Sequence, residues 1–268
     1  SDLRLMEREL ARLGAGADGY YSFLEHSRRL WRFSERAYLE PASQTVADIL
    51  RRSDVAELAD RAFVSTMYQG VTRHVSEPHL RDMLAFFSKY VGSSPYDSPG
   101  MMNLLAYSQL GYGLWYVEGG MYNLARAYAR LMDELGVVVR LGAEVTSITS
   151  EGRRVTGVTL ADGSRLGADA VVSNMEVIPT YERLLPEGRS LLPSYRQRFE
   201  PAASGLVLHL GIKHDYPQLL HHNFFYSADA ERFCHTIHRR HQLPEDPHIY
   251  LVCPTKTEPG LAPPGHSI

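Results

Sequence analysis

The hydrophobic pattern changes its period at Gly113, and this change restricts the fold more than any other feature of the sequence. Up to about residue 110, apolar residues recur at helical spacing. From Gly113, a short aromatic segment and one helix that ends at Gly136 lead into apolar runs with the spacing of strands. The sequence therefore predicts an α/β (α+β) chain, in which a mostly helical part is followed by a compact α/β module.

Strands are predicted on both sides of Asn174. VVVRL, EVTSITS, RVTGVTL and SRLGADAVVSN read as successive strands, with a turn at EGRR and a tight hairpin at Asp162 and Gly163. Further on, SGLVLHLGIKH alternates apolar residues as a half-buried antiparallel strand does, and HIYLVCP is its expected partner. We therefore expect three regions, comprising residues 1–112, 113–174 and 175–268.

The stretch SEPHLRDMLAFFSKYVG predicts an amphipathic helix. Ser76 is the expected N-cap, Pro78 lies in the first turn and Gly92 ends the helix. One wide apolar face is formed by Leu80, Met83, Leu84, Phe87, Tyr90 and Val91. This face is interpreted as facing the core, with the wall of a ligand cavity or a membrane-dipping surface as the alternative.

The sequence GAGADG contains a G-x-G-x-x-G pattern at Gly14, Gly16 and Gly19. The pattern binds a pyrophosphate only where a strand leads into the glycines and a helix follows them. The preceding residues instead predict a helix with Ser1 or Asp2 as N-cap and Gly14 as C-cap. We therefore interpret GAGADG as a link between two helices.

Charge, cysteine content and motifs exclude several classes of protein. The net charge is −3, without long runs of one sign, which argues against a nucleic-acid partner. Two cysteines outside any C-x-x-C pair fit a reducing cytoplasm and indicate neither a disulfide framework nor a zinc site. His235, His238 and His241 follow at intervals of three, but without a zinc signature we predict no metal. Hydrolase, P-loop and kinase motifs are absent, and no apolar run is long enough to cross a bilayer.

Two long segments carry a family resemblance. The stretch from SPYDSPGMMNLL through GLWYVEGGMYNLARAYARLMDELG to GVTLADGSRLGADAVVSN resembles the bacterial phytoene desaturases, including diapophytoene desaturases and related carotenoid oxidases. SGLVLHLGIKHDYPQLLHHNFFYS and IYLVCPTKTEPGLAPPGHS resemble a later segment of that family. These are amine-oxidase-like flavoproteins, with a discontinuous FAD domain and an inserted substrate domain.

The resemblance implies a cofactor, FAD, and a set of site residues. The backbone of Val145 is expected to meet the adenine, and Ser173 and Asn174 are expected to lie near the nucleotide. The segment WYVEGGM is expected to join the substrate domain to the FAD domain beside the cavity for the substrate. Its residues are Trp115, Tyr116, Glu118, Gly119, Gly120 and Met121. No catalytic acid or base is assigned.

The resemblance also implies that this chain is the central part of a longer protein. It begins at Ser1, without an initiator methionine, and ends in the loop GLAPPGHSI. In the family, the G-x-G-x-x-G motif and a second flavin motif stand near the two ends, so both are expected outside these 268 residues. We therefore expect the 268 residues alone to bind FAD poorly and to be inactive.

The function implied is the desaturation or oxidation of a carotenoid-type polyene such as phytoene or diapophytoene. The flavin carries the chemistry, while the protein holds the polyene in a dry tunnel. A cytoplasmic protein that touches the inner face of the membrane peripherally is expected, because the substrate is dissolved there. Two alternatives stay open: a carotenoid isomerase or retinoid saturase-like flavoenzyme, and a non-catalytic helical interaction module without flavin.

Overall fold

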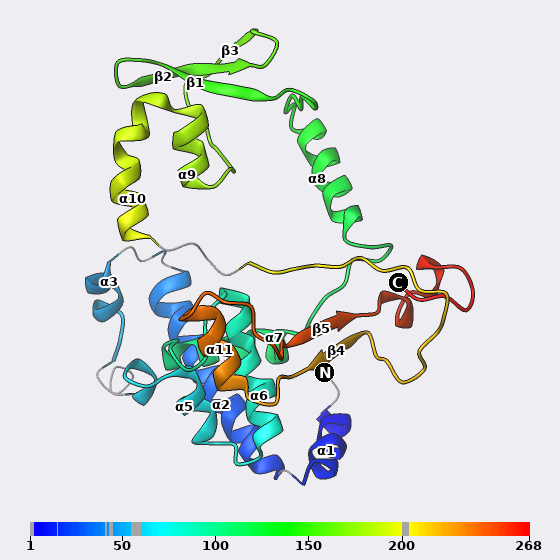
Figure 1. Ribbon diagram of the computed structural model, residues 1–268. Helices are drawn as coiled ribbons and strands as arrows, with labels where there is room; N and C mark the ends of the chain where they lie inside the picture. The colour runs from blue at the N-terminus through cyan, green and yellow to red at the C-terminus, as the bar shows by residue number, and fades with distance from the viewer. Residues whose placement is uncertain (1–2, 15, 41, 43–44, 55–59, 200–203) are drawn as a thin grey trace. The chain divides into compact units, whose positions relative to one another are not determined.

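The computed structural model describes residues 3–14, 16–40, 42, 45–54, 60–199 and 204–268 (Figure 1). The chain divides into two compact units. The first unit comprises Ser1–Tyr116 and Ala203–Ile268, and the second comprises Val117–Ala202. The predicted N-cap at Ser1 or Asp2 lies outside the described residues. The family resemblance assigns residues 1–112 and 175–268 to the substrate domain and residues 113–174 to part of the FAD domain, and this assignment stays a prediction.

Helices make up most of the first unit. Its α-helices are α1 (Leu3–Arg12), α2 (Ala17–Ser34), α3 (Val46–Arg51), α5 (Met67–Thr72), α6 (Pro78–Ala85), α7 (Leu104–Tyr112) and α11 (Ala230–His238). Its short 3-10 and π segments are η1 (Glu35–Leu39), η2 (Arg61–Phe63), η3 (Phe86–Val91), η4 (Gly100–Asn103), η7 (Pro254–Lys256) and η8 (Pro259–Leu261). Strands β4 (His222–Phe225) and β5 (Ile249–Val252) pair antiparallel, with Phe224 opposite Tyr250.

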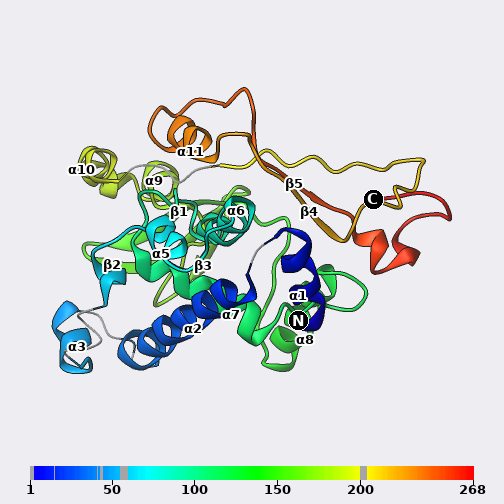
Figure 2. The same ribbon diagram turned by 90° about the horizontal axis from the view of Figure 1, so that it is seen from below.

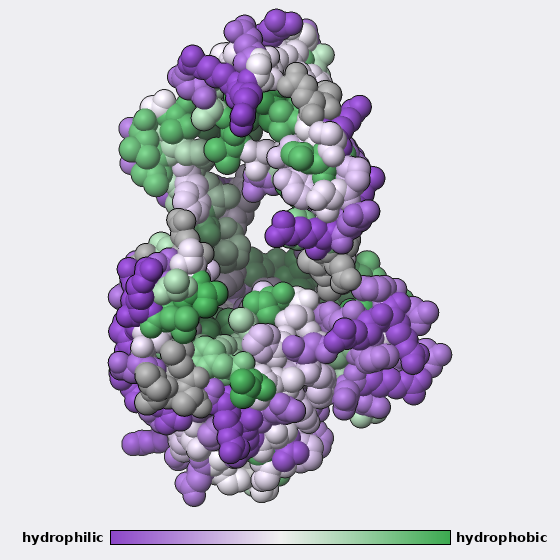
Figure 3. All heavy atoms as spheres, turned by 90° about the vertical axis from the view of Figure 1, so that its left-hand side faces the viewer, coloured by the Kyte–Doolittle hydropathy of each residue, from purple (hydrophilic) through white to green (hydrophobic). Residues whose placement is uncertain are grey.

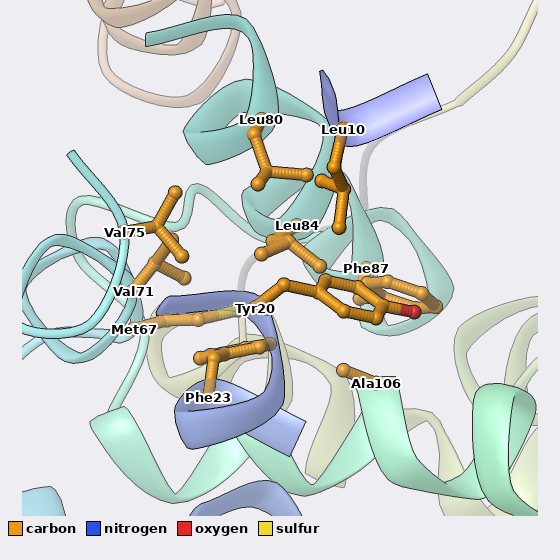
Figure 4. Packing of buried hydrophobic residues seen from close by; sticks show 10 residues of the cluster. All are labelled: Leu10, Tyr20, Phe23, Met67, Val71, Val75, Leu80, Leu84, Phe87 and Ala106. Atoms are coloured by element: carbon orange, nitrogen blue, oxygen red, sulfur yellow. The ribbon is translucent and has the colours of Figure 1, made fainter. Parts of the chain in front are cut away.

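Helices α2 and α7 pack side by side, as Figures 1 and 2 both show. Buried side chains from α1, α2, α5, α6 and α7 converge on one core (Figure 4). This core consists of Leu10, Tyr20, Phe23, Met67, Val71, Val75, Leu80, Leu84, Phe87 and Ala106. Burying so many large apolar side chains is the main source of stability of the first unit.

The predicted helix over residues 76–92 is present, but its two ends differ in kind. Glu77, and not Ser76, is the N-cap: its carboxylate accepts from Leu80 N at 2.5 Å. A carboxylate reaches the free N–H groups of the first turn and carries the charge that a helix N-terminus favours. Pro78 opens α6 as predicted, and the chain tightens into η3 before Gly92 ends it at φ +67°.

The apolar face of this helix is only partly in the core. Leu80, Leu84 and Phe87 are buried, which confirms the core-facing interpretation for them. Met83, Tyr90 and Val91 are exposed. The apolar stripe of this helix is thus wider than the part of it that packs into the core.

The second unit contains a three-stranded antiparallel meander. Its strands are β1 (Val145–Glu151), β2 (Arg154–Leu160) and β3 (Arg165–Gly167), in the order β1-β2-β3. Its helices and helical turns are α8 (Tyr122–Glu134), α9 (Val177–Pro179), η5 (Thr180–Leu184), η6 (Pro186–Leu191) and α10 (Leu192–Arg198). The turn at Gly152, at φ +59°, and the hairpin at Asp162 and Gly163 are both confirmed. Asp162 Oδ1 accepts from Ser164 N at 2.9 Å and holds that hairpin closed.

Helix α8 ends as predicted at Gly136, whose φ is +73°. The amide of Val137 donates to Met132 O at 2.8 Å, which closes the last turn. The apolar stripe of α8 is exposed over Leu124, Tyr128 and Leu131. In Figure 3 apolar side chains, in green, gather on the surface of the second unit at the top of the view.

Three predicted strands are not formed. Residues 137–141, the apolar run 169–174 and the segment 204–211 belong to no strand. Ile212 makes one isolated bridge with Ser267. HIYLVCP was expected to pair with residues 204–212, but its strand β5 pairs with β4 instead. A segment with high strand propensity forms a strand only where it can hydrogen-bond to the edge of a neighbouring strand, and β4 provides that edge for β5.

Apolar side chains of the three segments that form no strand are consequently exposed to solvent. Leu141, Val172 and Leu206 are 91%, 96% and 90% exposed. The predicted fold class, α/β (α+β), is nevertheless confirmed, because helices dominate and the sheets are small and antiparallel. Over the described parts of the chain, no helix is long and apolar enough to cross a membrane.

Candidate functional site

A cluster of aromatic, imidazole and carboxyl groups in the first unit surrounds Tyr116, one of the predicted substrate residues. The Tyr116 hydroxyl donates to Glu258 Oε2 at 2.9 Å. The Tyr116 ring meets the His221 ring edge to face at 6.1 Å between centroids. His221 Nδ1 lies 2.6 Å from Thr257 Oγ1. The two segments that meet Tyr116 therefore come from about 105 and 140 residues later in the sequence, where β4 begins and η7 ends.

The cluster continues along β4 and β5. The rings of His221 and His222 are 4.4 Å apart, and His222 Nδ1 lies 2.7 Å from the Tyr250 hydroxyl. His222 lies opposite Val252, so Tyr250 is its diagonal neighbour across this antiparallel pair, and their rings stack at 5.9 Å between centroids. We call Tyr116, His221, His222, Tyr250, Thr257 and Glu258 the tyrosine–histidine cluster.

Three side chains of the tyrosine–histidine cluster, those of Tyr116, Tyr250 and His222, have pKa values shifted towards the neutral form. The hydrogen bond to Glu258 raises the pKa of Tyr116, because it stabilises the protonated phenol beside a carboxylate. Burial raises the pKa of Tyr250, and burial together with His221 lowers the pKa of His222. A neutral imidazole that shares a proton with a phenol can hold or pass a proton, and it can also orient a ligand.

The other predicted substrate residue of the first unit, Trp115, lies apart from these contacts. Its side chain is 90% exposed, and Nε1 donates to Tyr112 O at 3.2 Å. The structure therefore brings Tyr116 into a cluster and leaves Trp115 at the surface.

The remaining predicted substrate residues open the second unit as a tight turn. Gly119 and Gly120 have φ values of +78° and +95°, and the amide of Gly120 donates to Val117 O at 2.9 Å. A Cβ at Gly119 would lie 2.5 Å from Asn123 Nδ2, so the Asn123 side chain would have to move, and the positive φ itself favours glycine there. Glu118 O accepts from Asn123 Nδ2 at 2.9 Å, while the Met121 side chain is exposed at the start of α8.

The predicted cofactor residues lie on two segments of the second unit. Val145 begins β1 opposite Leu160, and the register shifts directly after it, before Ser147. Such a bulge interrupts the ladder and re-aims the backbone, and bulges are common beside binding sites. Asn174 is exposed. Ser173 is engaged locally: its Oγ accepts from Met175 N at 3.2 Å and lies 3.0 Å from Thr180 Oγ1.

The glycine pattern at residues 14–19 does not have the setting of a pyrophosphate site. Helix α1 leads into Gly14, whose φ of +69° and bond to Ala11 O at 3.1 Å confirm it as the C-cap. Gly16 is the N-cap of α2. The described residues thus show no pyrophosphate cradle at this pattern, and the adenine contact at Val145 stays a prediction. A strand leading into a G-x-G-x-x-G motif is not among them.

The histidines that prompted a metal hypothesis do not converge. His235 and His238 lie on α11, but His241 follows the helix at φ +52°. In the part of the chain that the structure describes, no group of three His, Cys, Asp or Glu side chains is placed to hold a metal ion.

Comparison with known proteins identifies the relatives of this chain. Residues 4–267 match the family described as flavin containing amine oxidoreductase. The chain is 47% identical over 269 aligned residues to a 4,4'-diapolycopene oxygenase of Methylomonas sp, covering 100% of this chain and 54% of the relative. It is 42% identical over 247 residues to a 4,4'-diaponeurosporene oxygenase of Staphylococcus haemolyticus (strain JCSC1435), covering 92% and 49%. A Staphylococcus aureus (strain USA300) protein of the same name is 42% identical, covering 91% and 50%.

These comparisons confirm the resemblance to carotenoid desaturase-like oxidoreductases and the flavin cofactor of the family. The chain spans about half the length of the curated relatives it matches. The sequence predicts Tyr116 as a substrate residue, which stays a prediction, and does not single out Glu258 and Tyr250. No short motif marks these two residues, because they contact Tyr116 and His222 only across long separations in the chain.

Proposed function

Because this chain belongs to the family of flavin-containing amine oxidoreductases, we propose that the whole protein is an FAD-dependent enzyme that oxidises a carotenoid-type polyene. The observation that carries the proposal is the identity to carotenoid oxygenases, which extends over nearly the whole chain. The names of these relatives favour a 4,4'-diapocarotenoid as substrate and oxygenation over the desaturation of phytoene.

Bound FAD would supply the two-electron oxidation. The chain's own residues would bind and orient the cofactor and the polyene, and would exclude water from them. On the cofactor side, the backbone at Val145 is proposed to receive the adenine, since the bulge after it leaves the regular ladder. The exposed end of the 169–174 segment, at Ser173 and Asn174, is proposed to line the nucleotide.

On the substrate side, Tyr116 is proposed to contact the polyene. Its phenol is fixed by Glu258 and its ring rests against His221, so a planar apolar face is presented in a defined orientation. The exposed Trp115 of the first unit is proposed to contact the polyene as well, and Glu118, Gly119, Gly120 and Met121 are proposed as substrate residues of the second unit.

Access to a polyene dissolved in a bilayer calls for a peripheral membrane contact, and we propose a cytoplasmic protein that touches the inner face of the membrane. Exposed Met83, Tyr90 and Val91 on the α6–η3 segment support this.

Flotation of the protein with vesicles is the measurement, and loss of flotation in a triple Ser variant at these positions is the expected result. Equal flotation of the variant would contradict the assignment.

The function is tested by products. A protein of the relatives' length that contains this chain is produced in cells that accumulate 4,4'-diaponeurosporene, and the extracted carotenoids are analysed by mass. Oxygenation adds mass and desaturation removes two hydrogens, whereas an isomerase leaves the mass unchanged. An oxygenated product is expected. An unchanged carotenoid pool together with a colourless protein would instead support the non-catalytic interaction module.

A further inference from the structure

A small cavity lies in the first unit, between the α6–η3 segment, helix α11 and the segment that enters β5. Its volume is about 40 Å³. Its wall combines four aromatic rings, those of Phe86, Tyr96, Tyr226 and Phe233, with small apolar residues and polar side chains. Lys89, Cys234 and His248 also line it. None of these residues belongs to the tyrosine–histidine cluster or to the predicted flavin residues.

His248 is the unusual member of this wall. Its ring stacks on Phe233 at 3.8 Å between centroids and meets Tyr226 edge to face at 5.4 Å. Both ring nitrogens are buried, and neither has a hydrogen-bond partner among the described residues. A neutral imidazole carries one donor and one acceptor, and burying such groups without partners is costly. The His248 ring therefore needs a hydrogen-bonding partner from a molecule in the cavity.

Lys89 lies on the same wall. Its Nζ lies 4.2 Å from the centroid of the Phe86 ring and 5.8 Å from that of Phe233. The ammonium is thus held over the rings by a cation–π contact, with N–H groups to offer an oxygen atom.

The other polar groups of the cavity favour their neutral forms. Burial raises the pKa of Asp82 and Tyr226 and raises that of the Cys234 thiol to about 11. Burial and nearby Lys89 lower the pKa of His248 to about 4. A charged ligand would be poorly solvated here, and no metal-holding group is found among the residues described. The wall fits an apolar molecule that carries one neutral oxygen.

We propose that this cavity binds the oxygen-bearing end of an apolar isoprenoid chain, with its hydroxyl or carbonyl oxygen hydrogen-bonded to His248. The rings surround the carbon next to the oxygen, and Lys89 supplies a further donor to that oxygen. The chemistry of the end group follows from the cavity, whereas the choice of an isoprenoid rests on the proposed function. The site would hold an oxygenated polyene end and not its hydrocarbon counterpart.

Water alone is the competing occupant. A cavity of this size admits water, and polar side chains on the wall, among them Asp82, Ser88 and Ser93, offer it partners, but water leaves the rings without an apolar contact. An alcohol places one oxygen at the imidazole and apolar carbon against the rings, so it satisfies both parts of the wall.

The test compares farnesol with β-farnesene, the matched hydrocarbon, as probes of the purified protein. Titration calorimetry is expected to show farnesol binding about fivefold to tenfold more tightly, the contribution typical of one hydrogen bond. In nitrogen-edited NMR of histidine side chains, farnesol is expected to shift a ring nitrogen of His248. Neither readout depends on flavin or turnover, so this proposal and the proposed function can fail separately.

His248→Phe keeps a planar ring but removes both nitrogens, and it is expected to abolish the preference for farnesol. His235→Phe, an exposed position on α11 outside the cavity, is the matched control and should keep it. Near-ultraviolet circular dichroism establishes that each variant is folded. Three results would each overturn the proposal and leave water as the occupant. They are equal affinities for the two probes, a preference for farnesol that persists in His248→Phe, and a His248 signal that farnesol does not move.

Discussion

At the scale of single residues, the contact between Tyr116 and Glu258 spans 142 positions of sequence and defines the tyrosine–histidine cluster. A phenol fixed by a carboxylate loses rotational freedom, which prepares its ring to receive a ligand. The proposed role of Tyr116 is to position the polyene, so substitution of Tyr116 should affect substrate binding more than the chemical step.

Tyr116→Phe in a protein of the relatives' length is therefore expected to raise KM for the polyene roughly fivefold and to change kcat little. The measurement is a steady-state comparison with Tyr38→Phe, an exposed tyrosine outside the cluster. A fall in kcat with unchanged KM would assign the hydroxyl to the chemistry instead.

His248 predicts a pH dependence of stability. Its pKa is lowered to about 4 by burial and by Lys89 on η3, against a smaller opposing effect of Asp246. The unfolded chain has the ordinary value of about 6.5 and takes up the proton first. The stability that the neutral ring contributes is thus complete above about pH 6.5 and is lost as the pH falls towards 4.

His248→Phe should reduce the loss of unfolding free energy between pH 7 and pH 4.5 by about 1–3 kcal/mol. Denaturant titrations at the two pH values measure it. The acid sensitivity that remains belongs to other histidines whose pKa burial lowers, among them His26 and His74. An unchanged pH dependence would show that the His248 ring is solvated.

At the scale of elements, α6 has two different apolar sides. Leu80→Ala should destabilise the protein by about 2–5 kcal/mol, because Leu80 is 1% exposed and its removal leaves a cavity in the core. Met83→Ala on the same helix should stay within about 0.5 kcal/mol, since Met83 is exposed. Chemical unfolding of both variants checks this, and equal losses would mean that Met83 is covered in solution.

The glycine pattern at residues 14–19 gives a prediction about cofactor binding. Gly16 has φ −71°, and a Cβ there would meet nothing within 4 Å. Gly16→Ala should therefore leave the flavin content of a protein of the relatives' length unchanged and lower its stability by no more than about 1 kcal/mol, because alanine is a poorer N-cap than glycine. Loss of flavin from this variant alone would show that the backbone at Gly16 approaches a phosphate after all.

Elements governed by local contacts could be predicted from the sequence. Gly136 ends α8, and Asp162 closes the β2–β3 hairpin, because each depends on neighbours within a few residues. The segments 137–141 and 204–211 were predicted as strands from their apolar content, but a strand also needs an edge to pair with. For the same reason Tyr116 could be predicted through the resemblance, whereas Glu258 could not.

At the scale of the whole molecule, two compact units divide the chain between Tyr116 and Val117, inside the segment that the resemblance assigns to the junction of two domains. The second unit has the meander and the bulge at Val145. The first unit has the large core, the tyrosine–histidine cluster and the cavity at His248. Cofactor roles are thus proposed for the second unit, and substrate roles for residues of both units.

The central claim is that a flavin held by the whole protein oxidises a polyene. The most direct measurement is the visible flavin absorbance of a protein of the relatives' length, mixed with 4,4'-diaponeurosporene in vesicles without oxygen. The flavin is expected to be bleached in a single turnover, and to be bleached more slowly at equal substrate concentration in Tyr116→Phe. A flavin that stays oxidised with this polyene, while dithionite still reduces it, would contradict the claim.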